Sequence, residues 1–280
     1  MATQPDVSPG KRGRRRDGSP WRTWDRWQWP ALLVIAAVAA VADAWDMTSD
    51  GLEVYYAAGV RSMAGNWHAF LYDSFDPSRG ITLDKLPGPF WVQALSVRAF
   101  GMSVWAMVLP QIVWSVLTVV VLFLAVRRVA GPVTGLTAAA ILAISPATIL
   151  SAHGNLGDPL FVLLSVLAAD AALRAVQGRG WWLALAAVWA GLAFQEKMTE
   201  AWLLAAVLAV VYLVAGPAGL RRRLARLAAA TSVLAVVSLA WLVFMSIYRS
   251  PPAGRSRRAP RRPSRRGSRT PATTARSSGR

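Results

Sequence analysis

The sequence predicts an all-α fold, a polytopic membrane helix bundle of about seven transmembrane helices, and three observations lead to this prediction. Hydrophobic residues make up 55% of the 280 residues, and they form long apolar runs separated by short polar links. Lys and Arg gather in alternate links. Several of the 14 tryptophans flank the first run, as expected for aromatic residues at the membrane interface. This composition excludes an assembly of one or two soluble domains.

Apolar runs of about 18 residues can cross a bilayer, and seven runs come near or exceed this length. They cover residues 29–46, 103–126, 131–151, 159–176, 180–195, 200–216 and 227–248. The first, fourth, fifth and sixth are short or carry a charge. The first run lacks a clear small-residue cleavage site, so we expect a retained span and not a signal peptide.

The basic residues predict the orientation. Lys11 and six arginines precede the first span, and further arginines fall at 127–128, 174–179 and 221–226, in or beside alternate links. By the positive-inside rule these links are cytoplasmic. The other links carry most of the acids. We therefore expect a multi-pass plasma-membrane protein with a cytoplasmic N-terminus and an extracytoplasmic active face.

The two ends of the chain differ from the membrane module at 29–248. Residues 1–28 are expected to be a basic, disordered cytoplasmic arm. Residues 249–280 carry 11 of the arginines, so the formal charge of +17 falls to about +6 without them and indicates no nucleic-acid partner. This tail is either a genuine basic segment that binds anionic lipid or polymer, or, as we favour, an out-of-frame reading of a GC-rich gene. In the second case the true protein continues.

The first outer loop, residues 47–102, contains two short amphipathic segments. "LEVYYAAGVRSMAG" and "PFWVQALSVRAFG" carry apolar residues at helical spacing but are too short to span, so we expect helices that lie along the interface. The segment between them is rich in turn formers and is expected to be irregular.

Asp84 and Lys85 form a charged pair between these two segments. A Lys at the water–lipid boundary is a compact cation suited to a phosphate, and the neighbouring Asp could position it or bind substrate. The alternative is structural: a Lys that snorkels to the interface and an Asp that begins a turn before "LPGP". The spacing alone favours the structural alternative.

Asp50 and Glu53 precede Tyr55 and Tyr56 at the start of the first loop helix. They could form an N-terminal capping arrangement in which Glu53 completes a capping box. They could equally supply a general base at the membrane surface. The residues leave both interpretations open.

Asp158 lies directly before a span in "SAHGNLGDPLFVLL". An acid at this position is costly unless it is solvated or paired, which makes it a functional candidate. The alternative is a helix cap in front of Pro159. His153 and Asn155 share the link and could orient a ligand, but the histidines do not indicate a metal site.

The outer turn "AFQEKMTEAW" contains Glu196, Lys197 and Glu200, for which a solvated charged turn is the favoured interpretation. Asp170 and Arg174, four residues apart, are expected to form a structural pair. Phosphate-binding loops, dinucleotide-binding turns and Gly-x-Ser-x-Gly elbows are missing from the sequence, so a nucleotide-activated substrate has no visible binding site.

The outer loop and the following span resemble the family 39 glycosyltransferases, GT-C fold membrane enzymes that include protein O-mannosyltransferases and lipid A aminoarabinose transferases. The similarity covers about residues 30–248. Its most specific part is an Asp-Lys-x-Pro element, here Asp84, Lys85 and Pro87. "SPATILSAHGNLGDPLFVLL" resembles the second acidic loop of the family, and "GLAFQEKMTEAWLLAAVLAV" its outer turn with a lysine.

This resemblance implies transfer of a sugar, mannose or a related hexose, from a polyprenyl-phosphate donor to a protein or lipid acceptor, without a cofactor. Glu53 or Asp50 would be the base, with Asp158 as a further catalytic acid. Lys85, with Asp84, would bind the departing phosphate. The expected substrate contacts are Tyr55, Tyr56, His153, Asn155 and Lys197.

The chain also departs from the family pattern. Leu86 stands where relatives often carry the first of two prolines, His153 stands where they often carry Arg, and Asp50 is offset from Glu53 by three positions. Further spans of the family are replaced by the arginine tail, so the acceptor-binding half is expected to be absent. Two other classes remain open: a transporter or flippase-like carrier of a lipid-linked substrate, and an inactive truncated remnant. A carrier should show broken, charged spans in paired halves, and the sequence has no such symmetry.

Overall fold

The computed structural model describes residues 26–45, 47, 51–76 and 81–248, and they form helices joined by short links. The helices are α1 (Gln28–Ala44), α2 (Val54–Gly65), α3 (Trp67–Leu71), α4 (Gly88–Phe100), α5 (Val104–Ala130), α6 (Pro132–Ala143), α7 (Pro146–His153), α8 (Asp158–Val176), α9 (Trp182–Ala193), α10 (Met198–Ala215) and α11 (Leu220–Ile247). Within these ranges only one isolated β-bridge, between Ser74 and Thr82, departs from the all-α prediction.

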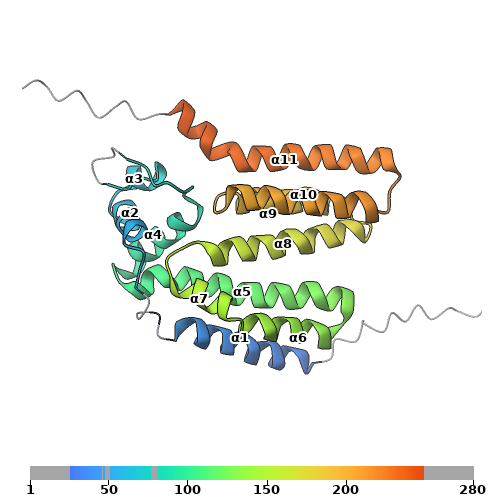
Figure 1. Ribbon diagram of the computed structural model, residues 1–280, viewed down its shortest axis with the longest axis horizontal. Coiled ribbons are helices and arrows are strands. Elements are labelled where there is room, and N and C mark those ends of the chain that lie inside the picture. The colour runs from blue at the N-terminus through green and yellow to red at the C-terminus, as the bar shows by residue number, and fades with distance from the viewer. Residues whose placement is uncertain (1–25, 46, 48–50, 77–80, 249–280) are drawn as a thin grey trace, which may run out of the picture.

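The long helices lie side by side, while α2, α3 and α4 gather at one end of the bundle (Figure 1). Helix α5 packs against α1, α6 and α8, and α9 packs against α8 and α11. The two amphipathic loop segments predicted from the sequence form α2 and α4. The loop therefore folds over the end of the bundle, where it can contribute side chains to a site.

In the part of the chain that the structure describes, four helices can each cross a membrane by length and composition: α5, α8, α10 and α11. Helices α6 and α7 meet at a 51° bend and count as a fifth span if they are taken together. By this criterion, four or five of the seven expected spans are confirmed. Helices α1 and α9 fall on the remaining two runs, but they have only 17 and 12 residues. The 180–195 run is shortened because turn residues occupy both of its ends.

Two glycines with positive φ end one loop helix and one long helix. Gly101 (φ 86°) follows α4 and Gly131 (φ 89°) follows α5, and each donates its N–H to a carbonyl of the last helical turn. Arg98 of α4 donates to the Ala64 carbonyl at 2.8 Å and thereby satisfies the exposed end of α2. The Arg98 contact thus joins the end of α4 to the end of α2.

Burial differs strongly along the bundle. Half of the most apolar stretch of α5 and 44% of that of α8 are buried within the molecule, compared with 11% in both α10 and α11. The last two helices therefore present most of their apolar surface to their surroundings, as lipid-facing helices do.

Charge is sorted between the two ends of the long helices. The end that carries α2–α4, here called the site end, holds every described acid except Asp170. The opposite end, here called the basic end, holds Asp170 and the arginines of three links: Arg127, Arg128, Arg174, Arg179, Arg221, Arg222, Arg223 and Arg226. The arginine-bearing links that alternate in the sequence thus meet on one side of the bundle (Figure 1).

Candidate functional site

The Asp84–Lys85 pair is held by a leucine on each side. Leu83 packs in the cluster of α2 and α4, where Gly59 leaves room for it: a Cβ at Gly59 would lie 2.8 Å from a Leu83 methyl group. Leu86 packs with Leu164 and Phe194 between α8 and α9. Leu86, which departs from the family pattern, thus ties the loop to the bundle, and Lys85 is placed where loop and spans meet.

Lys85 lies over the ring of Tyr56, with its Nζ 4.9 Å from the ring centroid. Tyr56 is buried and stacks on Phe90, with the ring centroids 5.0 Å apart. Burial, together with the charge of Asp84 and a hydrogen bond to it, raises the pKa of Tyr56 to about 12. The phenol therefore stays protonated. Its hydroxyl donates to Asp84, and its ring face binds the Lys85 cation.

Glu53 begins the first loop helix, but its side chain makes no capping hydrogen bond and is exposed. Glu53 is itself the N-cap residue of α2, so it does not stand at the third helical position that a capping box requires, and this interpretation is wrong for Glu53. The Glu53 backbone is held by the buried Asn155 amide, which accepts from its N–H at 2.8 Å and donates to its carbonyl at 3.2 Å. Gln93 in turn donates to the Asn155 carbonyl at 2.9 Å.

These contacts join the start of α2 to the α7–α8 link. Asn155 is fully buried. A direct substrate contact by Asn155 would require its clamp on Glu53 to open, so its visible role is to position Glu53. Asp50 lies outside the described residues.

Asp158 is the first residue of α8, and its side chain pairs with Lys197 at 2.8 Å. The helix cap at this position is Gly157, so the interpretation of Asp158 as a cap is wrong. The hydrogen bond to Asp158 raises the pKa of Lys197. Both side chains remain about one-third exposed, and the pair can therefore exchange partners with an incoming charged group.

Glu196 is a member of the site that the sequence did not indicate. The expected solvated turn is wrong here, because Glu196 is only 6% exposed. Its carboxylate lies against Gly157, where a Cβ would overlap both the carboxylate and Pro89. Burial, with repulsion from Asp158, raises the pKa of Glu196 to about 7, although Lys85 and Lys197 act in the opposite direction. Its burial depends on Gly157, about 40 residues earlier in the chain, so no local pattern in the sequence indicates it.

Asp73 is a second buried acid beside the charged pair. It adopts a positive φ of 53° and its carbonyl accepts from the N–H of Leu83 at 3.0 Å, so it holds the backbone before Asp84. Burial, and then the charge of Asp84, raise the pKa of Asp73 to about 8. Asp73 is therefore largely protonated at neutral pH.

The remaining candidates lie at the edge of this cluster. Tyr55 stacks on Phe75 with the ring centroids 4.8 Å apart. His153 is buried and its Nε2 lies 3.3 Å from the Ala42 carbonyl, so it contacts α1. Across the described ranges, His, Asp and Glu side chains form no group of three suited to a metal ion.

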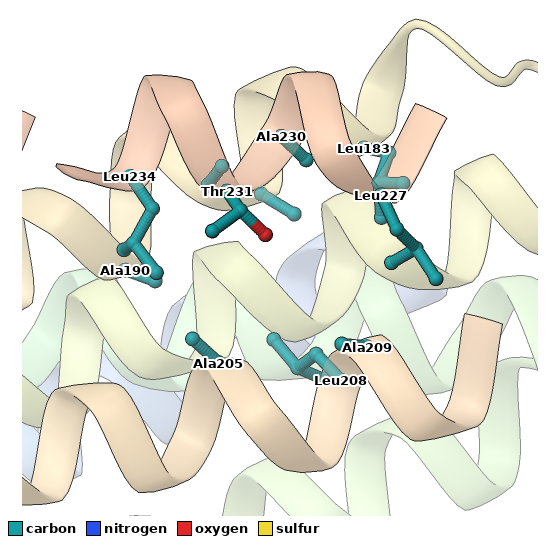
Figure 2. A pocket seen from close by; sticks show the side chains of 11 residues that line it. Leu183, Ala190, Ala205, Leu208, Ala209, Leu227, Ala230, Thr231 and Leu234 are labelled. Carbon is teal, nitrogen blue, oxygen red and sulfur yellow. The ribbon is translucent and has the colours of Figure 1, made fainter. Parts of the chain in front are cut away.

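A separate apolar cavity of about 50 Å³ lies between α9, α10 and α11 (Figure 2). Alanine and leucine side chains line it, and the hydroxyl of Thr231 is the one polar group among the side chains drawn. Because this cavity lacks charged groups, we assign the chemistry to the charged cluster at the site end.

The charged residues described at the site end thus include an exposed carboxylate, Glu53, and two lysines, Lys85 and Lys197, and they lie where the loop helices meet the ends of the spans. Such an arrangement can accept a proton from a hydroxyl and stabilise a developing phosphate charge.

Comparisons with known proteins define the class of this protein: it is a member of a membrane-embedded glycosyltransferase family. The family described as dolichyl-phosphate-mannose-protein mannosyltransferase matches residues 84–241, more than half of the chain, and this chain belongs to it.

Two proteins of Bacillus subtilis (strain 168) are similar over the module. The candidate mannosyltransferases YycA and YkcB are each 32% identical, over 76% and 75% of this chain. The matched regions are 31% and 30% of those two proteins, so the chain spans about a third of their length.

The fold is similar to crystal structures of ArnT from Cupriavidus metallidurans. In its apo state the TM-score is 0.61, and in its complex with undecaprenyl phosphate it is 0.59. Both share 24% sequence identity with this chain and cover 80% of it and 42% of the ArnT chain. The all-helical membrane bundle of this chain is thus an ArnT-like module.

Proposed function

We propose that this chain transfers a sugar, mannose or a related hexose, from a polyprenyl-phosphate donor to a protein or lipid acceptor. The observation that carries the proposal is Lys85, a cation held by Leu83 and Leu86 at the junction of loop and spans. The ArnT complex with undecaprenyl phosphate supports this class of donor for a protein of the same fold.

The proposed reaction needs one base and one charge stabiliser. The Glu53 carboxylate takes the proton of the acceptor hydroxyl as its oxygen attacks the anomeric carbon. The bond between that carbon and the phosphate oxygen breaks with inversion, and the oxygen keeps the electron pair. Lys85 offsets the charge on the departing lipid phosphate, while Asp84 and Tyr56 orient Lys85. Asp50 is the alternative base. The pair of Asp158 and Lys197 lines the other side of the proposed donor site.

The proposed topology places the site end outside the plasma membrane and the basic end in the cytoplasm, in agreement with the positive-inside rule. It counts seven crossings, with α1, α9 and the bent pair of α6 and α7 each taken as one. The donor phosphate would then lie at the outer head-group layer, at the level of Lys85.

The test is transfer of radiolabelled mannose from polyprenyl phosphate in membranes that contain the full chain. Label is counted in the protein and lipid fractions, because the acceptor class is open. Lys85→Ala and Glu53→Gln should each lower the rate by about 10²–10³-fold, the range for a lost charge stabiliser or general base. Arg61→Gln is the matched control, because Arg61 is an exposed charge on α2.

Undiminished transfer in both Lys85→Ala and Glu53→Gln would contradict this mechanism. Wild-type membranes that transfer no more label than membranes without the chain would remove the activity itself.

A further inference from the structure

A polar pocket of about 250 Å³ opens at the basic end, away from the candidate active site. Arg128, at the end of α5, and Arg174, at the end of α8, line it together with Gln177 and Arg179 of the α8–α9 link. Helices α5 and α8 both run from the site end to the basic end, so their last turns meet there.

Two of the three guanidinium groups are held in place. Asp170 is only 6% exposed, and its two oxygens each bind a different arginine, Arg128 and Arg174. The Arg174 guanidinium also lies over the Trp182 ring, 4.1 Å from the centroid. Because these contacts fix the guanidinium groups in advance, a ligand would not have to order them.

The pocket carries more positive charge than its carboxylate can balance. Asp170 is the only acid that the described residues place at this end, whereas three arginines line the pocket. Arg174 and Arg179 both repel Arg128 electrostatically. The exposed side chain of Arg179 has no ion-pair partner among the described residues. Two positive charges therefore remain for a ligand.

We propose that this pocket binds the phosphate group of an anionic membrane lipid. Guanidinium groups match phosphate oxygens in paired hydrogen bonds, and basic pockets between spans bind lipid head groups on the cytoplasmic side. The pocket lies at the ends of apolar helices, at the depth of a head-group layer, so the lipid reaches it from the bilayer. This site is independent of the proposed sugar transfer.

The test is native mass spectrometry of the full chain in detergent with dioleoylphosphatidylglycerol or dioleoylphosphatidylcholine at matched concentrations. The wild type should bind the anionic lipid preferentially. Arg179→Gln should weaken that binding about tenfold, the effect of one lost charge-assisted contact. Arg222→Gln, which removes an exposed arginine of α11 at the same end, is the matched control and should leave binding unchanged.

Three outcomes would overturn the proposal. Equal binding of the two lipids would show that the anionic head group is not preferred. Unchanged binding in Arg179→Gln, or equal losses in the two variants, would indicate general charge attraction and not a site. Millimolar inorganic phosphate is the second arm of the test. Displacement of the lipid by this phosphate would assign the pocket to a soluble phosphate, whereas retention supports the lipid.

Discussion

The two ends of the bundle hold charge in different ways. The chain has only three lysines, and both that the structure describes, Lys85 and Lys197, lie at the site end. At the basic end every described cation is an arginine, and two of them bind the buried Asp170. Lysine is a compact, mobile point charge, whereas arginine forms fixed paired hydrogen bonds. The site end thus keeps charges that can change partners, and the basic end keeps charges that fix structure.

The largest effect on stability is expected at the basic end. Asp170→Ala leaves two guanidinium groups without their buried partner and should lower the free energy of unfolding by about 3–5 kcal/mol. Transfer activity per folded molecule should stay unchanged. Thermal unfolding in detergent and the transfer assay measure the two quantities. A loss of activity as large as that of Lys85→Ala would contradict a purely structural role for the charges of the basic end.

The next effect is the pH dependence that Glu196 confers. Its pKa rises from an ordinary 4.5 to about 7 on folding, so the folded state binds the proton more tightly. Stability from this group is therefore present at acid pH and is lost as the pH rises between these values, by about 3 kcal/mol in total. Glu196→Gln should reduce the pH dependence of the free energy of unfolding in this window, and the part that Asp73 confers remains. An unchanged pH dependence in this variant would contradict the prediction.

A smaller effect is expected from Asn155→Ala, which removes the clamp on the Glu53 backbone. The loss of two part-buried hydrogen bonds should lower the free energy of unfolding by about 2 kcal/mol. Because Glu53 is then held less firmly, the transfer rate should fall more than this destabilisation explains. Parallel melting curves and rates at a temperature where both proteins are folded separate the two effects. Equal rates there would show that Asn155 has no part in positioning the base.

The smallest stability effect is expected for Asp158→Asn. The Asp158–Lys197 pair is about one-third exposed, so its loss should change the free energy of unfolding by less than about 1 kcal/mol. If the pair binds substrate, the KM for the donor should rise several-fold while stability is nearly constant. A large decrease in melting temperature would instead indicate that this pair has a structural role, as the charges of the basic end do.

Much of the fold could be predicted from the sequence, because apolar runs and alternate arginine links depend on local composition. The seven runs fall on helices, but the short lengths of α1 and α9 were not visible in hydropathy. The site could be predicted where one residue carries the signal, as with Lys85 and Glu53. Asp170 and Arg174 pair as expected, but the Arg128 contact joins residues 42 positions apart and needed the structure.

Burial explains the remaining errors. Glu196 was expected in a solvated turn because its neighbours are charged, yet Gly157 and Pro89 close over it. For Asp158 the sequence left a functional role and a helix cap open, and in the structure it pairs with Lys197, which directly precedes α10. Both outcomes depend on which links meet at the site end, and no local pattern in the sequence records this.

The attachment of Leu86 between α8 and α9 has a consequence for membranes of different thickness. Spans tilt when the hydrocarbon layer thins, and the ends of tilted helices move with the head groups. Because Leu86 is packed among those ends, we expect Lys85 to move with them and, in the proposed topology, to keep its depth relative to the lipid phosphates. Leu86, which stands where relatives often carry proline, would thus hold Lys85 at a constant depth in the membrane.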